Sequence, residues 1–521
     1  MLIYFLHFLA DTLIYSVLLV GGHPNMKIQS KYLLLGLLAV SLASCNSGYS
    51  GYGGYGGYYN PKGNQNSYGT QASYATPDEH YTPDVVENPF VEVKDGSRTS
   101  NVSLTSTSFA YTTVRESIND GSLYYAKNNA RIEEMLNYFS YGYVNDTDDA
   151  LVTKLELDAC PWNNEHYLAS VVVKAKPAIT QNVKNNIVIL VDKSGSMSSI
   201  FSLVKTSLHT LVDNLGNDDV VSIVSYASSG KIECEGLTGK DKTRLNRVVD
   251  GLKASGSTYG EDGIEKAYEM AYKYFIEGGN NRVVLLTDGD FNVGKVSGTE
   301  LTALIKQKAS DGVYLTCCGY RSHDNNTLYT LADNGNGNAY YIDCELEAEK
   351  VFEEELGKSL YVVAKDAKCQ VEFSDDVVSY RLLGYETRQM SDEEFDDKNK
   401  DAGEIMSDHT TVALYELELK TETPEGFFFK TTLRYKDPTS EANKEVINTK
   451  SELSVSRRAD FDFAGYIAEY TLALTESQFK GDSSFNHLLE RMNDEYINDK
   501  YRDDFKSLVS NTKELVNNYL A

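Results

Sequence analysis

The stretch "IVILVDKSGSMSSI", residues 187–200, changes from a continuous apolar run to a short polar turn. On that turn Asp192, Ser194 and Ser196 occupy alternate positions. Alternation directs small oxygen-bearing side chains toward the same point. An apolar strand that ends in such a turn predicts that something is bound at its carboxyl end.

The surrounding region, residues 185–360, alternates between strand and helix patterns. Its apolar runs are rich in β-branched residues and nearly continuous, as expected for strands covered on both faces. These runs are "NIVILVD" (186–192), "DVVSIVSYA" (219–227), "NRVVLLTDGD" (281–290), "GVYLTCCGY" (312–320) and "AYYID" (339–343). Helical patterns separate them, which predicts an α/β fold with a doubly wound, mostly parallel sheet. Ligands of such sheets bind beyond the carboxyl ends of the strands, where the polar turn and "TDGD" (287–290) both lie.

These residues carry a family resemblance. "DKSGSM" (192–197) resembles the D-x-S-x-S signature of von Willebrand factor type A domains. In that family the signature begins a metal-ion-dependent adhesion site, which is completed by a threonine on a later loop and an aspartate after the fourth strand. Here "GSTYGEDGI" (256–264) supplies Thr258 and "LLTDGDFNVG" (285–294) supplies Asp288. The implied metal ligands are Asp192, Ser194, Ser196, Thr258 and Asp288.

The residue types suit a hard divalent cation, most simply Mg²⁺, with Mn²⁺ or Ca²⁺ as alternatives, because such ions prefer oxygen ligands. By resemblance, the three hydroxyls bind the ion directly, and the two aspartates act largely through water and hydrogen bonds. One position then stays open for an Asp or Glu of a partner protein. Asp290 is interpreted as a turn residue or as a residue that supports the ligands without binding the ion itself.

Simpler explanations compete with this site. The serines could cap the following helix, and Asp288-Gly289 could be a plain turn. A nucleotide site is disfavoured because no G-x-G-x-x-G or G-x-x-x-x-G-K-[ST] follows a strand. The net charge of −27 argues against nucleic acid. No set of catalytic residues is apparent, so an enzyme is not expected. The alternative function is an envelope scaffold whose metal site is structural or vestigial. Metal-assisted hydrolysis is the least expected function.

The amino end predicts export and lipidation. From Met26 the chain reads "MKIQSKYLLLGLLAVSLASCNSG", with two lysines, an apolar stretch and small residues before Cys45. "LASC" (42–45) resembles a bacterial lipobox, which makes Cys45 the lipidated residue. Residues 1–45 are therefore an upstream extension plus signal peptide, and the Gly/Tyr/Ser-rich residues 46–85 are a flexible tether. We expect a lipid anchor in a bacterial cell envelope, at the outer membrane or cell surface rather than the inner membrane.

The flanks also resemble a bacterial lipoprotein family with a single A domain. "ENPF" (87–90), "VRESINDG" (114–121) and "ARIEEMLNYFSYGY" (130–143) are similar to its leader, although Thr105 and Thr107 stand where the family has acids. The stretches 363–388, 401–419 and 462–485 are similar to its carboxyl region. Residues 86–150 are expected to form a helical leader and 456–521 a carboxyl-terminal helical segment.

Alternating strand patterns flank the α/β region. They predict one β-sandwich built from residues 151–184 and 361–455, into which the domain 185–360 is inserted. Alternation further predicts sheets with one packed face and one wet face. The remaining cysteines, which could form bridges or stay free, are Cys160, Cys234, Cys317, Cys318, Cys344 and Cys369. Cys317 and Cys318 are adjacent on an expected strand and should face opposite sides.

Overall fold

The computed structural model describes residues 86–520 except 105–107, 178–183, 259, 290–297, 322–324, 357–360, 399, 401, 455–457 and 493–498. The predictions for residues 1–85, including Cys45, and for Thr105, Thr107 and Asp290 lie outside the described residues. Among the residues that are described, no helix is both long enough and apolar enough to cross a bilayer.

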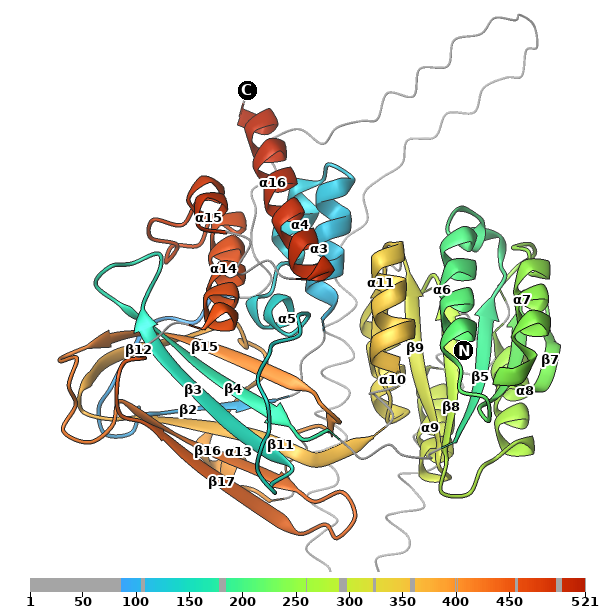
Figure 1. The fold of residues 1–521 in the computed structure, drawn as a ribbon, viewed down its shortest axis with the longest axis horizontal. Helices are drawn as coiled ribbons and strands as arrows, with labels where there is room; N and C mark the ends of the chain where they lie inside the picture. The colour runs from blue at the N-terminus through green and yellow to red at the C-terminus, as the bar shows by residue number, and fades with distance from the viewer. Residues whose placement is uncertain are drawn as a thin grey trace, which may run out of the picture. The chain divides into compact units, whose positions relative to one another are not determined.

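The α/β domain contains a six-stranded sheet in the order β10-β9-β8-β5-β6-β7 (Figure 1). Its strands are β5 (Asn185–Asp192), β6 (Val220–Tyr226), β7 (Gly230–Thr238), β8 (Asn280–Thr287), β9 (Val313–Tyr320) and β10 (Ala339–Ile342). All neighbours pair in parallel except β7, which is antiparallel to β6. The expected fold class is confirmed. The strand order reverses direction at β5, so the switch point where such sheets bind ligands lies at the end of β5.

Helices cover both faces of this sheet. They are α6 (Phe201–Asn214), α7 (Lys242–Gly251), α8 (Glu261–Lys273), α9 (Gly298–Ser310), α10 (Asn325–Asn334) and α11 (Glu345–Glu349), with short turns η1 (Gly195–Ser199), η2 (Gly239–Asp241) and η3 (Lys350–Glu355). Two separate hydrophobic cores result, and Cys317 lies in one while Cys318 lies in the other. The two thiols therefore face opposite sides of β9, as predicted. All six cysteines in the described part of the chain are free thiols.

A β-sandwich flanks the α/β domain in sequence. One sheet has the order β1-β12-β15-β4-β3 and the other β13-β2-β11-β16-β17, with β14 paired to β11. The strands are β1 (Val91–Glu92), β2 (Thr99–Ser103), β3 (Leu151–Ala159), β4 (Tyr167–Ala175), β11 (Val362–Phe373), β12 (Val377–Leu383), β13 (Gln389–Met390), β14 (Ile405–Met406), β15 (Thr410–Leu419), β16 (Phe429–Lys436) and β17 (Asn443–Lys450). The chain thus leaves the β-sandwich after β4, forms the α/β domain, and returns to the sandwich at β11. The leader is not helical throughout, since it supplies β1 to one sheet and β2 to the other.

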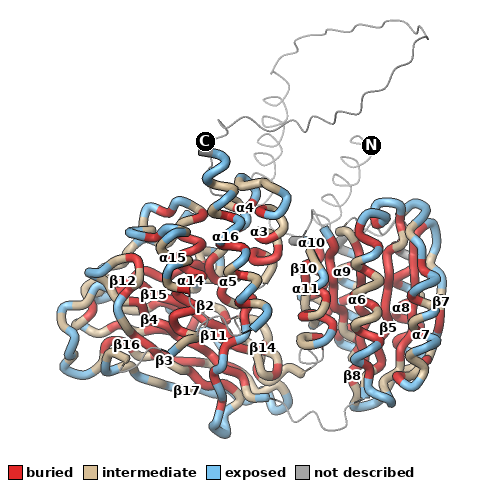
Figure 2. The backbone as a smooth tube through the Cα atoms, turned by 45° about the horizontal axis from the view of Figure 1, so that its top comes forward, coloured by how far each residue is buried: buried red, intermediate tan, exposed pale blue. Residues whose placement is uncertain are grey.

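The prediction of one wet face is wrong for the first sheet. Every residue of β15 from Thr410 to Leu417 is buried (Figure 2). The reason is a third layer of helices, α3 (Phe109–Asn119), α4 (Leu123–Asn129), α5 (Ile132–Leu136), α14 (Ala459–Leu474), α15 (Phe485–Arg491) and α16 (Lys500–Leu520). Leu168, Val172 and Leu414 of the sheet share one hydrophobic core with these helices. The leader and carboxyl-terminal helices therefore pack on one another and on the sandwich.

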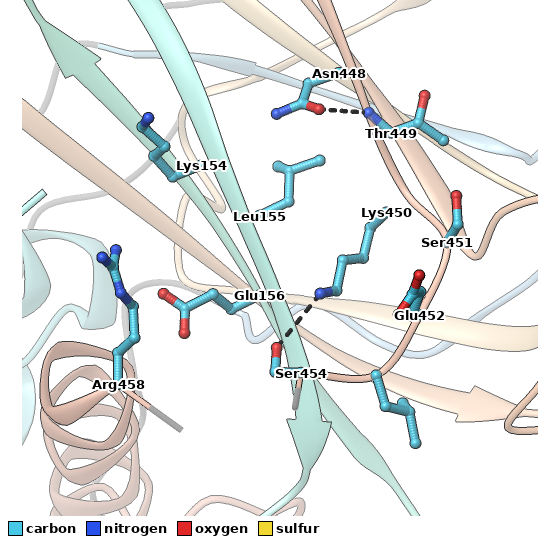
Figure 3. Close-up of a pocket in the computed structure, with 11 residues that line it drawn as sticks. Lys154, Leu155, Glu156, Asn448, Thr449, Lys450, Ser451, Glu452, Ser454 and Arg458 are labelled. Carbon is cyan, nitrogen blue, oxygen red and sulfur yellow. Dashed lines mark hydrogen bonds between the residues drawn. The ribbon is translucent and has the colours of Figure 1, made fainter. Parts of the chain in front are cut away.

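The outermost strands β3 and β17 of the two sheets lie next to each other, and residues from both line a shared pocket (Figure 3). The Asn448 amide donates to the carbonyl of Thr153 (3.0 Å). Farther along, Ser454 donates its N–H to the Leu157 carbonyl (2.8 Å), and its hydroxyl accepts from the Leu157 N–H (3.1 Å). These contacts occupy backbone groups that would otherwise invite another strand.

Candidate metal site at the end of the parallel sheet

The site begins where β5 ends. Asp192 is its last residue and is completely buried. The Asp192 carboxylate accepts the Ser194 N–H at 2.7 Å, and the Lys193 N–H donates to the carbonyl of Tyr226 at the end of β6 (2.8 Å). The turn is therefore fixed against the neighbouring strand, and the carboxylate is held in place by the backbone that follows it.

The two serines of the turn come together. The hydroxyls of Ser194 and Ser196 lie 2.9 Å apart, with Ser194 buried and Ser196 exposed. Helix α6 begins at Phe201 with Ile200 as its N-cap, and neither α6 nor the η1 turn receives a side-chain capping bond. Helix capping therefore does not account for these serines. The pair presents oxygens from the buried end of β5 to the exposed edge of the sheet.

The loop that carries Thr258 is joined to the same turn. Gly195 donates its N–H to the Gly256 carbonyl (3.0 Å), and Ser255 donates its N–H to the Lys193 carbonyl (2.6 Å). Gly256 has φ +99°, and a Cβ there would lie 3.0 Å from the Ser228 hydroxyl, so glycine suits this close approach. Thr258 follows two residues later and is half-buried. The structure thus brings the threonine loop against the Asp192–Ser196 turn.

Asp288 comes from the neighbouring strand on the other side of β5. It directly follows β8, whose last residue, Thr287, donates its hydroxyl to the Asp192 carboxylate at 3.4 Å. The same hydroxyl accepts the Gly289 N–H (3.2 Å), and Gly289 has φ +90°. The Asp288 carboxylate lies near enough to raise the pKa of Asp192.

The electrostatics of this cluster fit a dication. Burial raises the pKa of Asp192, hydrogen bonds from Ser194 and Tyr226 oppose that rise, and the Asp288 charge adds to it. Two carboxylates at one sheet end repel each other, and a divalent cation would relieve that repulsion. In the described part of the chain, no three His, Cys, Asp or Glu side chains converge as a metal site. A cation here would therefore depend on the serine and threonine hydroxyls, which are donors suited to Mg²⁺.

Three supporting residues were not anticipated from the sequence. Tyr226 and Thr287 end the strands on either side of β5 and act on the Asp192 carboxyl group. Glu233 on β7 pairs with Lys193 (2.9 Å), which follows Asp192. The sequence did contain a signal for Tyr226 and Thr287, because each ends an apolar run that forms a strand beside the switch point. The Glu233 pair had no such signal.

Comparison with known families identifies the class. Residues 186–354 match the von Willebrand factor type A domain, and residues 75–170 match a family described as von Willebrand factor. Residues 358–515 match a family described as uncharacterized protein YfbK, C-terminal. The chain is therefore a von Willebrand factor type A domain-containing protein. Its carboxyl-terminal region is of the YfbK type found in bacteria, which confirms the family resemblance.

Individual proteins are also similar to this chain. The chain is 38% identical over 324 residues to "Uncharacterized protein YfbK" of Escherichia coli, covering 60% of this chain and 56% of that relative. It is 25% identical over 305 residues to "Uncharacterized protein sll0103" of Synechocystis, covering 56% and 70%. The match thus spans little more than half of the E. coli relative. A solved structure, von Willebrand factor type A from Catenulispora acidiphila, matches with TM-score 0.36 and 16% identity over 64% of this chain and 82% of that chain. The domain class indicates a role in protein interaction or adhesion.

Proposed function

We propose that this protein is a lipid-anchored protein of a bacterial cell envelope that binds a protein partner through a divalent cation. The observation that carries this proposal is the meeting of Asp192, Ser194 and Ser196 with the Asp288 strand end at the switch point of the sheet. The ion would be Mg²⁺, or alternatively Mn²⁺ or Ca²⁺. Its partner would supply an Asp or Glu side chain.

Each residue has a role in this proposal. The Ser194, Ser196 and Thr258 hydroxyls would hold the ion, and the Asp192 and Asp288 carboxylates would balance its charge. The bound ion supplies a positive centre with a position open to an outside carboxylate. A net charge of −27 would otherwise repel an acidic partner group, so a local cation is required for such an interaction.

The anchoring part of the proposal rests on the sequence around Cys45, with the outer membrane or cell surface preferred to the inner membrane. The acidic charge and the lack of nucleotide motifs disfavour nucleic acid and nucleotide as ligands. The proposal assigns no enzymatic activity to the site.

Calorimetric titration with Mg²⁺, Mn²⁺ and Ca²⁺ tests the metal site. We expect one ion per chain for the unmodified protein and strong losses of affinity for Ser194→Ala and Thr258→Ala. Ser198→Ala is a matched control, because Ser198 lies on the same turn but donates its hydroxyl to the Gly195 carbonyl (2.7 Å). Equal affinities in all three variants, or no ion uptake by the unmodified protein, would contradict the assignment.

Capture of a partner from envelope extract tests the function itself. We expect a partner retained in Mg²⁺, released by chelator and lost with Asp192→Ala. A partner retained equally under all conditions would instead support the scaffold with a structural or vestigial metal site. Turnover of an added ester or phosphoester that disappears with Asp192→Ala would favour metal-assisted hydrolysis.

A further inference from the structure

A second candidate binding site lies on the β-sandwich. It is a hollow of about 450 Å³ on the outer face of the β13-β2-β11-β16-β17 sheet. Helix α13 (Asp392–Asp396) borders it together with Lys398 and Lys400, which follow the helix, and strands β11, β16 and β17 form the rest. The volume falls within the range of small-molecule sites and exceeds that of a single inorganic ion.

The lining of this hollow, here named the basic pocket, carries mostly positive charge in a strongly acidic chain. Its six cationic residues are Lys368, Lys398, Lys400, Arg434, Lys436 and Lys444. Only three acidic residues, Asp366, Asp396 and Glu445, accompany them. The whole chain has 49 Lys and Arg against 76 Asp and Glu, so this local excess of positive charge reverses the overall balance.

The strand register places like charges directly opposite each other. Lys368 on β11 faces Arg434 on β16, and Lys365 faces Lys436 two residues farther along β16. Like charges at directly opposed positions destabilise a sheet. Lys365 lies outside the hollow and is paired with Glu441 (2.8 Å), so it is the Lys368–Arg434 pair that brings like charges together in the lining, where a bound anion would offset their repulsion.

Lys368 is the most deeply placed of these cations. Its side chain is 4% exposed, and its ammonium group donates to the carbonyls of Glu394 (3.1 Å) and Asp397 (2.6 Å) at the end of α13. No carboxylate of a described residue lies within ion-pair distance of it. Burial lowers the pKa of Lys368 and the neighbouring Arg434 charge lowers it further, while the charges of three nearby aspartates, Asp397, Asp366 and Asp396, partly oppose this shift. The two carbonyls stabilise the ammonium as a helix-end contact, and nearby carboxylates offset its charge only from beyond ion-pair distance.

The three acidic side chains are already engaged by other cations. Arg434 binds Asp396 (2.7 Å) and Glu445 (2.8 Å), and Lys436 binds Asp366 (2.6 Å). The Phe395 ring lies against the Arg434 guanidinium at 4.5 Å and fixes its plane. Lys400 is paired with Glu394 (2.7 Å). The surplus positive charge therefore resides on Lys368 and on the exposed Lys398 and Lys444, which make no ion pair with a described carboxylate.

We infer that the basic pocket binds a ligand bearing several oxyanion groups, either phosphates or carboxylates. Arg434 and the lysines provide charged donors of the kind that bind both groups. The volume admits a phosphorylated or polycarboxylated small molecule, or the end group of an anionic polymer. This site is separate from the proposed metal site and does not depend on it.

Calorimetric titration of the full chain with inorganic pyrophosphate and, separately, with citrate tests this inference. Both titrations are made in metal-free buffer so that binding at Asp192 does not contribute. We expect one equivalent of at least one probe to bind, more weakly as ionic strength rises. Tighter binding of pyrophosphate assigns the pocket to phosphates, and tighter binding of citrate assigns it to carboxylates.

Variants locate the binding. Arg434→Gln and Lys444→Gln are each expected to weaken binding about tenfold, as loss of a charged hydrogen bond implies. Lys430→Gln is the matched control, because Lys430 lies on the same strand, outside the pocket, paired with Glu372 (2.5 Å). Circular dichroism verifies that each variant is folded. Absence of binding by both probes, or equal weakening by Lys430→Gln, would overturn the inference.

Discussion

Arg115 joins three segments that are far apart in the sequence, and its replacement should be costly. Arg115 lies on α3 and its side chain is 4% exposed. Its guanidinium contacts Asp343 after β10 (2.5 and 2.7 Å), Glu347 on α11 (3.2 Å) and Asp504 on α16 (2.8 Å). One cation therefore links the leader, the end of the α/β domain and the carboxyl-terminal helix.

The magnitude follows from what Arg115→Met leaves behind. Asp343 and Glu347 would remain buried, each side chain 3% exposed, without their cation. Removing one partner of a buried pair costs about 3–5 kcal/mol. Burial already raises the pKa of Glu347, while Arg115 holds it down. Without Arg115 the carboxyl group takes up a proton more readily, so the loss should be larger at pH 8 than at pH 5.

Urea denaturation followed by tryptophan fluorescence measures this loss. Trp162 is the single tryptophan and lies in the same hydrophobic core as the helices around Arg115. Arg98→Met is the control, since Arg98 pairs with Asp375 (2.5 Å) at the surface, where such a pair contributes little to stability.

Neutralising the partners supplies a second check. Adding Asp343→Asn and Glu347→Gln to Arg115→Met should recover part of the lost stability, because the uncompensated charges disappear. If Arg115→Met lowers the free energy of unfolding no more than Arg98→Met does, the argument from buried charge is refuted.

Three further predictions concern the α/β domain. Burial alone would raise the pKa of Glu233, but hydrogen bonds from two lysines and a serine lower it to about 2 from 4.5, so its stabilising contribution is complete above pH 4.5 and lost as the pH falls toward 2. Acid titration of stability should therefore be shallower in Glu233→Gln, and an unchanged slope would disprove this. Saturating Mg²⁺, at about 100 times its dissociation constant, should raise stability by about 2.7 kcal/mol, and Asp192→Asn should abolish the rise in a thermal melt. Gly263→Ala should lower the free energy of unfolding by about 1–3 kcal/mol, because the new Cβ would lie 2.7 Å from the Cβ of Tyr226. Gly251→Ala should raise it by about 0.5–1 kcal/mol, because no atom lies within 4 Å of the new Cβ. Similar urea midpoints for the two variants would argue against this packing.

The sequence was sufficient to predict the parallel sheet and the sheet edge at which the candidate site residues lie. Continuous apolar runs such as residues 187–191 predict strands covered on both faces, and the rule that ligands bind at carboxyl ends then places Asp192 and Asp288 at one edge. That both residues lie at the same edge of the sheet follows from strand order, which places β5 beside β8. Whether Thr258 approaches them could not be deduced from periodicity, because a glycine turn and two backbone bonds bring its loop there.

Other features had no local signal. β2 has the sequence "TSNVS", which lacks apolar alternation, yet Ser100 and Asn101 are buried. The strand is possible because the Asn101 amide bonds to Asp392 (2.7 Å) and Gln370 donates to Asn101 (2.8 Å). These partners lie more than 260 residues away in the chain. Hydrogen bonds and ion pairs between residues far apart in the sequence, such as these and those of Arg115, cannot be predicted from the hydrophobic pattern.

The insertion of the α/β domain has a consequence for how the chain is made. β4 pairs with β15, which begins about 235 residues after β4 ends. At ~5–20 residues per second, ribosomal synthesis leaves β4 without that neighbour for on the order of 10–50 s. The inserted domain emerges entire during this interval and can fold first, whereas the β3–β4 hairpin waits with an apolar edge uncovered. A fragment of residues 185–356 should consequently be soluble, while one of residues 86–356 should aggregate or require a chaperone.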